Sequence, residues 1–414
     1  MMKVLSATTQ GEWLTALPPL PPMPAGQPTS PLADRAKAEV QRAMSELFHC
    51  DHLIVLAGLG TSMGVAPAFD NGPTAPSMWD LWQRVEAETD AQSNGLNFNF
   101  QSLLGFIGHP AADTNIEALL SRCRLAQAFY TGDDNTRIAR FVDLAEREIV
   151  DATRFVSVDH PLQTHQQFLR RLARRSQRKQ RAKLFTTNYD KCFEEAARQA
   201  RLIVNDGFSP SIPSTFDPMN FTYDLVSRGT DGERQDFVPN LFHLYKVHGS
   251  VDWELDPVTR EVRKVPAPAR PLLIYPRNTK YELAFEPPYL EMIAAFQTSL
   301  RQPNVGLLVV GFGFNDNHLA EPILSAVRSN LGLKLVVAGP RLAPPISAEG
   351  TEYSGEVVSN VHLRTLANLA KAGDARIALI NQTFDGLLHY VPDLAAESDR
   401  EKHVARLRSL GQLP

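Results

Sequence analysis

Short apolar runs recur along the chain and alternate with amphipathic stretches. The runs end at glycine, proline or polar residues, and runs bounded in this way are typical of buried strands. They lie at residues 52–60, 183–187, 244–249, 271–276, 305–313, 333–339 and 375–381. Helical periodicity occurs between several of them, as at 33–49 and 289–302. Continuous apolar strands that alternate with helices predict an α/β fold, in which helices cover both faces of a parallel sheet.

Other segments depart from this alternation. Residues 77–182 show helical periodicity without a comparable strand, which predicts a helical insertion or subdomain beside the sheet. Residues 17–31 are rich in proline and predict an extended arm, either packed loosely on the surface or gripping a neighbouring subunit. The expected organisation is therefore an arm at 1–32, a main domain at 33–390 that includes the insertion, and a helical tail at 391–414.

The composition is that of a soluble globular chain. Hydrophobic residues make up 43%, charged residues 21%, and the formal net charge is −4, so no global attraction to nucleic acids or membranes is expected. No apolar run approaches the roughly 20 residues that span a bilayer, and the first residues lack the apolar centre of a signal peptide. Cys50, Cys123 and Cys192 form no CxxC pair. We therefore expect a cytoplasmic protein without disulfides or a zinc site.

The predicted strands end in residues that suit a ligand. In a Rossmann-like parallel sheet, ligands bind beyond the carboxyl ends of the strands, where the strand order reverses. Asn188 and Asp190 follow one strand, and His248 follows another. Glycine allows the backbone to approach a ligand, and free amides at a helix start suit phosphate. The candidate ligand-binding residues at strand ends are Gly58, Gly60, Thr61, Ser62, Gly311, Gly313 and Asn381.

The glycine-rich stretch GLGTSMG does not fit a hydride-transferring dehydrogenase. That class requires glycine where this chain has Met63, and a second strand that ends in an acid about 20 residues later. His248 projects from a strand end and is a candidate catalytic base. We interpret His318 as structural, and Asp316 as an N-cap of the helix that follows it. The basic run at 170–183 is expected to form a solvated helix face, or a contact for nucleic acid or an acidic partner.

Several stretches, taken in order over about residues 50–390, resemble the sirtuin family. GLGTSMGVAPAF, from Gly58, resembles the sirtuin glycine-rich cofactor loop, and TTNYD at 186–190 is similar to the strand end that supplies the catalytic Asn and an Asp near nicotinamide. KVHGS at 246–250 resembles the sirtuin histidine motif, and ALIN at 378–381 resembles the strand end that meets the adenosine half of NAD.

Other features differ from the sirtuin deacylases. GFGFNDNHL, from Gly311, is closer to the divergent sirtuin-like proteins of bacterial anti-phage defence. Deacylases carry four zinc cysteines after the histidine motif, in a module that also shapes the acyl-lysine groove, whereas residues 251–304 contain no cysteine. The resemblance therefore implies NAD as the substrate and water, rather than acyl-lysine, as the acceptor. It implies that Asn188 positions water or a ribose hydroxyl, that His248 accepts a proton, and that Asp190 orients nicotinamide or supports the loop.

Two other functions stay open at this point. The chain could bind NAD or ADP-ribose without hydrolysis, as a sensor or structural module, although such a module needs neither Asn188 nor His248. Protein deacylation is disfavoured by the missing cysteines. The resemblance to defence proteins also implies partners: a homo-oligomer that works with a HerA-type ring ATPase, or alternatively with an Argonaute-type protein.

Overall fold

A computed structural model of the chain provides the structure. It describes residues 2–16, 31–92, 98–175, 179–228, 235–268, 270–273, 288–344, 355–394 and 407.

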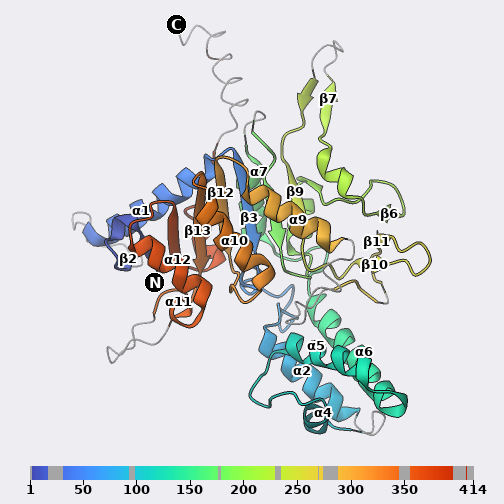
Figure 1. Cartoon of the computed structure of the whole chain (residues 1–414). Helices are drawn as coiled ribbons and strands as arrows, with labels where there is room; N and C mark the ends of the chain where they lie inside the picture. Colours follow the sequence, from blue (N-terminus) through green and yellow to red (C-terminus); the bar gives the residue numbers. More distant parts are fainter. Residues whose placement is uncertain are drawn as a thin grey trace.

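A nine-stranded sheet forms the centre of the molecule (Figure 1), in the order β2-β1-β14-β13-β12-β3-β4-β9-β5. Neighbouring strands from β14 to β5 pair in parallel, while β1 is antiparallel to β14 and β2 is antiparallel to β1. The predicted α/β fold with a largely parallel sheet is confirmed. The strands are β1 (Met2–Ser6), β2 (Leu14–Ala16), β3 (His52–Ala57), β4 (Lys183–Thr186), β5 (Ile203–Asn205), β9 (Leu241–Lys246), β12 (Val305–Val310), β13 (Leu333–Gly339) and β14 (Ile377–Asn381).

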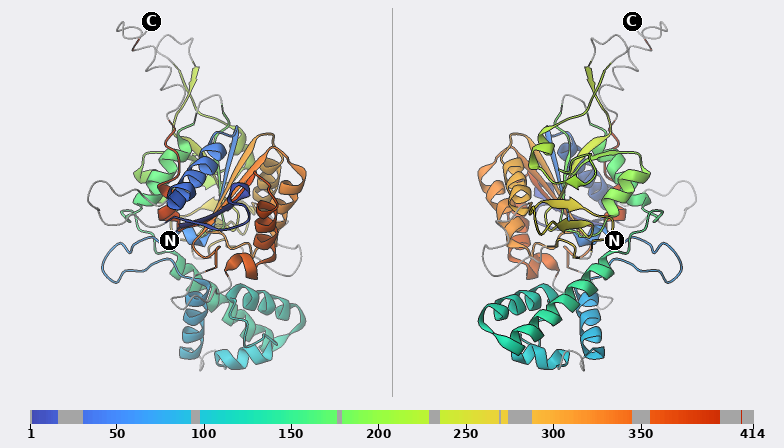
Figure 2. Two further views of the ribbon diagram at one scale, coloured as in Figure 1. Left: turned by 90° about the vertical axis from the view of Figure 1, so that its left-hand side faces the viewer. Right: turned by 90° about the vertical axis from the view of Figure 1, so that its right-hand side faces the viewer.

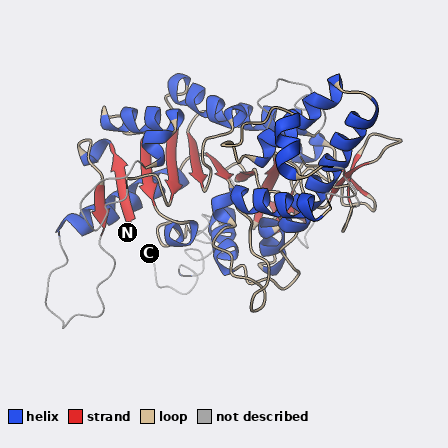
Figure 3. Ribbon diagram, turned by 90° about the horizontal axis from the view of Figure 1, so that it is seen from below, coloured by secondary structure: helices blue, strands red, loops and turns tan. Residues whose placement is uncertain are grey.

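Helices cover both faces of this sheet, as the view from below shows (Figure 3). The side chains of β3 alternate between the two faces of the sheet. Leu53, Val55 and Ala57 enter one core, whereas Ile54 and Leu56 enter the other. The first core is closed by α1 (Pro31–Phe48), α7 (Gln163–Ala173), α8 (Cys192–Gln199) and α13 (Phe384–Leu388). The second is closed by α9 (Tyr289–Leu300), α10 (Asn317–Ser329) and α12 (Val361–Lys371), which α11 (Glu356–Ser359) precedes.

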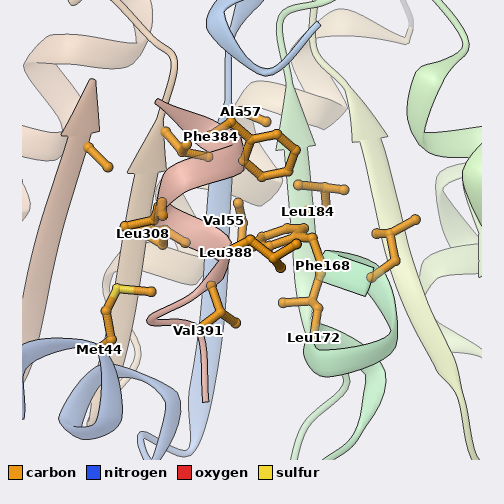
Figure 4. Packing of buried hydrophobic residues seen from close by; sticks show 14 of the residues in the cluster. Met44, Val55, Ala57, Phe168, Leu172, Leu184, Leu308, Phe384, Leu388 and Val391 are labelled. Atoms are coloured by element: carbon orange, nitrogen blue, oxygen red, sulfur yellow. The ribbon is translucent and has the colours of Figure 1, made fainter. Parts of the chain in front are cut away.

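The first core contains large side chains from segments far apart in the sequence. Phe168 of α7 and Phe384 of α13 lie over Val55 and Leu184 (Figure 4). The rings of Phe168 and Phe384 meet edge to face, with centroids 5.1 Å apart. This packing fixes α7 and α13 against the strands whose ends form the candidate site.

Four of the described helices form a separate subdomain beyond one end of the sheet (Figures 1 and 2). They are α2 (Met78–Ala91), α4 (Phe100–Phe106), α5 (Ile116–Phe129) and α6 (Gly132–Thr153). Trp82, Phe100, Leu119 and Phe141 belong to a core of their own. The helical insertion predicted at 77–182 is therefore too long, because α7 packs on the sheet and not on these helices.

The sequence prediction of an N-terminal arm is wrong over its first half. Residues 2–16 form a β-hairpin at the edge of the sheet, joined by η1 (Ala7–Thr9), and Val4 and Leu5 are fully buried. The proline-rich stretch at 17–30 and the tail predicted at 391–414 lie largely outside the described residues. Of the strand predicted at 271–276, the described residues 271–273 form only an isolated bridge, from Leu273 to Gly249, and residues 274–276 lie outside the described residues.

The basic run at 170–183 is not one helix, because α7 ends before most of it and β4 begins at its last residue. Several of its side chains bind other parts of the chain. Arg171 donates to backbone carbonyls at and after the end of α13, Arg175 donates to carbonyls between α1 and β3, and Arg181 forms an ion pair with Asp224. These charges thus contribute to the packing of the sheet domain.

The remaining strands form two small sheets. They are β6 (Ser214–Thr215), β10 (Trp253–Leu255) and β11 (Val262–Lys264) in one sheet, and the hairpin of β7 (Val226–Arg228) and β8 (Gln235–Phe237) in the other. Two short 3₁₀ helices, η2 (Leu59–Thr61) and η3 (Pro218–Thr222), complete the fold. Among the helices that the structure describes, none is long and apolar enough to cross a membrane.

Candidate active site

The strand order reverses between β3 and β12. The chain runs outward from β3 through β4 and β9, then returns to β12 on the other side of β3 and continues to β13 and β14. In an open parallel sheet such a reversal leaves a crevice beyond the carboxyl ends of the strands. The candidate residues follow these strands, so the topology brings them to one edge.

Glycines allow the loops after β3 and β12 to touch at this point. The amide of Gly60 donates to the carbonyl of Gly311 over 2.9 Å. A Cβ atom on Gly60 would lie 2.6 Å from the Cα of Gly311, and one on Gly58 would lie 2.6 Å from its carbonyl oxygen. Gly311 also has a φ of +65°, a conformation that favours glycine. These three glycines are thus required by contact between two loops, independently of any ligand.

A cavity of about 940 Å³ opens beside this contact. Gly60, Thr61, Gly311 and Gly313 line it, as the sequence predicted for a ligand site. Gly58 and Ser62 are not among its lining residues, and Ser62 is fully buried behind it.

Asn381 does not line the large cavity either. Its side-chain oxygen accepts a hydrogen bond of 2.9 Å from the amide of Ala343. The residues of this strand end that line the cavity are instead Thr383, Phe384 and Asp385. The structure therefore gives Asn381 a role in fixing the loop after β13.

A second cavity, of about 300 Å³, lies between the sheet edge and the helical subdomain. Its lining includes Asn188, Asp190 and His248, predicted as the catalytic group. It also includes Glu117, which the sequence did not assign, and Asp316, which the sequence assigned only as a helix cap. Six lining residues are common to both cavities: Leu59, Met78, Thr187, Phe312, Gly313 and Asn315. The two spaces therefore adjoin, and one extended ligand could occupy both.

The side-chain amide of Asn188 faces the glycine loop. Its Nδ2 lies 3.1 Å from the carbonyl oxygen of Gly58, 3.2 Å from Thr61 Oγ1 and 3.0 Å from Ser62 Oγ. These acceptors fix the amide, so its Oδ1 is the atom that remains to accept a hydrogen bond from a ligand or water.

Asp190 supports this arrangement from behind. Its Oδ2 accepts from Ser62 Oγ over 2.8 Å, and its Oδ1 accepts from the amide of Cys192 over 2.9 Å. The two oxygens thus bind the glycine loop and the start of α8, and Asp190 is 6% exposed. Of the two roles predicted for Asp190, the structure favours support of the loop over contact with nicotinamide.

His248 forms a pair with Asp316. His248 Nε2 lies 2.9 Å from Asp316 Oδ2, while Asp316 Oδ1 accepts the amide of His318 and so caps α10 as predicted. Burial alone would raise the pKa of Asp316, but the hydrogen bond and charge of His248 and the amide of His318 together hold that pKa below its ordinary value. An ionised Asp316 retains the proton on Nε2, which leaves the Nδ1 lone pair of His248 to act as a base.

A buried lysine ties the Asn188 segment to the strand of His248. Lys246, in β9, is 2% exposed and donates from Nζ to the backbone carbonyls of Tyr189 and Asp190. The same nitrogen lies 2.8 Å from a carboxylate oxygen of Glu194. Burial raises the pKa of Glu194, although the nearby charge of Lys246 opposes that rise.

Glu117 enters the small cavity from the first turn of α5. Burial raises the pKa of its carboxyl to about 7, an increase to which the charge of Asp316 adds and which His248 and a hydrogen bond with Tyr189 oppose. Sequence reasoning missed Glu117 because it lies in the helical insertion, far from any strand end. The sequence predicted Asp316 only as a helix cap, although Asp316 lies within the GFGFNDNHL motif.

No metal site is evident in the part of the chain that the structure describes. Within those residues, no group of three or more His, Cys, Asp or Glu side chains could hold a metal ion. Cys50, Cys123 and Cys192 are buried as free thiols.

The sequence matches the family described as SIR2-like domain over residues 182–345, a range that contains the Asn188 and His248 motifs. This part of the chain is therefore sirtuin-like, in agreement with the resemblance of TTNYD and KVHGS. No curated protein matches the chain.

The chain also has a distant likeness to several solved structures. Two mutants of a Sir2 homologue in complex with ADP-ribose share 14% identity at a TM-score of 0.38, covering 84% of this chain and 95% of theirs. A Sir2 homologue in complex with NAD shares 14% identity at a TM-score of 0.37, covering 85% of this chain and 93% of that one. These likenesses are too distant to assign a substrate.

Proposed function

We propose that this protein binds NAD across the two adjoining cavities and hydrolyses it to nicotinamide and ADP-ribose. The observation that carries the proposal is the meeting of Asn188 and the His248–Asp316 pair in a small cavity that adjoins a larger one at the switch point of the sheet. Volumes of about 300 and 940 Å³ fall in the range of cofactor pockets, roughly 300–1,000 Å³.

The reaction needs few groups. The bond between the ribose carbon and the nicotinamide nitrogen breaks, and its electron pair neutralises the positive charge of that nitrogen, so the leaving group needs no proton. Positive charge develops on the ribosyl carbon as it does in glycoside hydrolysis. Water attacks that carbon, held by Asn188 Oδ1, and His248 Nδ1 accepts the proton that water loses.

Two alternatives are weaker. A sensor that only binds NAD would have no need for a histidine fixed by an ionised aspartate beside a buried amide. A protein deacylase would need a groove for acyl-lysine, which in the sirtuin deacylases is shaped by the zinc module whose cysteines are missing from residues 251–304.

The first test is direct. We expect purified protein, incubated with NAD, to release nicotinamide and ADP-ribose in equal amounts, measured by chromatography of the products. Acetyl-lysine peptides added to the same reaction should remain acetylated, and no O-acetyl-ADP-ribose should form. Tight NAD binding without nicotinamide release, with or without a partner protein, would favour the sensor instead.

We further propose that the hydrolysis depletes NAD in anti-phage defence, under the control of a partner. The support is the likeness of GFGFNDNHL to defence proteins, and the harm that constant NAD loss would do to the cell. A homo-oligomer with a HerA-type ring ATPase is the first choice of assembly, and an Argonaute-type partner is the alternative.

This assembly predicts a rate that depends on the partner. Co-expression with a ring ATPase encoded beside this protein should raise nicotinamide release at least about tenfold over the isolated chain, and light scattering should show an oligomer. Deleting residues 1–32 is unsuitable as a test because it removes β1 and β2 from the sheet. Replacing 17–30 with a Gly/Ser linker of equal length tests the proline-rich segment alone. A fully active monomer that no partner affects would refute the assembly.

A further inference from the structure

The helical subdomain supplies a carboxylate to the cavity that holds Asn188 and His248. Glu117 is the second residue of α5, and it lines the 300 Å³ cavity together with these two residues. Its side chain is hydrogen-bonded with that of Tyr189, whose ring centroid lies 6.5 Å from that of His248. Figure 1 shows α5 in the subdomain that lies beyond the end of the sheet, so Glu117 comes from an element outside the sheet.

The carboxylates that line this cavity in the described part of the chain are Glu117, Asp190 and Asp316. Asp190 and Asp316 each use both oxygens on protein donors, since Asp190 accepts from a serine hydroxyl and an amide, and Asp316 accepts from His248 and an amide. Ionised carboxylates have about four acceptor positions. The hydrogen bond with the Tyr189 hydroxyl uses one of these positions on Glu117, so its carboxylate can still present negative charge to a ligand.

A negative charge in this cavity would favour the cleavage of NAD. As the bond to nicotinamide breaks, positive charge moves from the nicotinamide nitrogen to the ribosyl carbon and its ring oxygen. A fixed negative charge in a cavity screened from water stabilises that state more than the ground state. Asn188 is neutral, and His248 becomes positive when it accepts the proton, so neither supplies that negative charge.

We propose that Glu117 is an electrostatic residue of this site, whose ionised carboxylate faces the ribosyl carbon of NAD and stabilises its positive charge as nicotinamide leaves. The inference rests on the proposed NAD hydrolysis and adds to it a group from outside the sheet. Glu117 forms no covalent bond in this step, because water supplies the new oxygen and His248 takes the proton.

Ionisation of the Glu117 carboxyl predicts a pH dependence that can test the proposal. Burial raises the pKa of Glu117 to about 7. The titratable groups around it are His248 after β9, Asp316 before α10 and Tyr189 after β4. Because the pKa is raised, the carboxyl is mostly neutral at pH 6 and mostly ionised at pH 8. The ionised fraction therefore changes roughly tenfold between these two values.

The decisive experiment compares kcat for nicotinamide release by native protein and Glu117→Gln at pH 6 and pH 8, under the conditions that activate the native protein. We expect native protein to be faster by roughly 10²-fold at pH 8 and by roughly 10-fold at pH 6, with KM changed less than about threefold. The ratio of the two rates at each pH cancels any effect of pH that is common to both proteins. Glu117→Asp, which keeps the charge, should recover part of the rate at pH 8.

Asp134→Asn provides the matched control, because it removes one carboxylate from a half-exposed position in the first turn of α6, away from both cavities. Its rates should equal those of the native protein. A Glu117→Gln variant with native rates, or with a loss that is the same at both pH values, would overturn the inference while leaving NAD hydrolysis intact. Native protein that releases no nicotinamide would overturn the proposed function, and this inference with it.

Discussion

Replacing His248 with alanine is expected to lower kcat for nicotinamide release by about 10²- to 10⁴-fold. The reason is that His248 Nδ1 is the proposed base, oriented by the 2.9 Å hydrogen bond between Nε2 and Asp316. NAD affinity should change little, because most of the dinucleotide is proposed to lie in the larger cavity, which His248 does not line. Nicotinamide release at saturating NAD and binding calorimetry measure the two quantities separately.

Companion variants separate the base from its support. Asp316→Asn removes the charge that retains the proton on Nε2, and it should lower kcat by a similar order while keeping the cap of α10. Asn188→Ala should likewise lower kcat by more than about 10²-fold, since it removes the Oδ1 that is proposed to position water.

His318→Ala is the matched control, because His318 is an exposed histidine two residues from Asp316 whose backbone amide, not its ring, contacts that aspartate. Its kcat should stay within about threefold of native. Near-native turnover by His248→Ala, with unchanged melting temperature, would remove His248 from the reaction.

The sheet could be predicted from sequence because its strands are buried on both faces. Runs such as residues 305–310 and 333–339 are almost continuously apolar, and such runs predict parallel strands that are buried on both faces. The edge hairpin was missed because β1 and β2 are short and partly polar, and because β1 pairs with β14, a strand far away in the sequence. No local feature of MKVLS indicates that it pairs with a strand more than 370 residues later in the sequence.

In the candidate site, too, some residues could be predicted from the sequence and others could not. Asn188 and His248 were found because each directly follows a strand, and parallel topology requires such positions to meet. Glu117 was not found, because its place in the cavity depends on how a separate helical core docks against the sheet edge. Asp316 was correctly predicted as the N-cap of α10, but its second role, as the partner of His248, was not predicted, since a helix cap and a partner for histidine can be the same carboxylate.

Lys246 gives the largest expected effect on stability. Changing it to methionine is expected to lower the free energy of unfolding by about 3–5 kcal/mol at pH 7.5, because the loss of one buried partner leaves the other charge uncompensated. The partner is Glu194, 2.8 Å away, whose second oxygen already lacks a hydrogen bond. The carbonyls of Tyr189 and Asp190 would also lose their donor. Urea denaturation measures the change.

The pH dependence of this loss has a definite sign. Burial raises the pKa of Glu194 in the folded protein above the ordinary 4.5. A carboxyl with a raised folded pKa favours the folded state fully below its unfolded pKa, and this contribution is lost as the pH rises through the folded pKa. Without Lys246 the rise in pKa is larger, so the difference between native and Lys246→Met should be clearly smaller at pH 4.5 than at pH 7.5.

Two further variants decide whether the buried charge is the cause. Lys246→Met combined with Glu194→Gln should recover part of the lost stability at pH 7.5, because the uncompensated carboxylate is then absent. Lys183→Met, in the neighbouring strand β4, should cost little, since Lys183 binds the Ser299 hydroxyl and burial already lowers its pKa. Equal losses for Lys246→Met at both pH values, or no recovery in the double variant, would show that packing and not charge links β9 to the Asn188 segment.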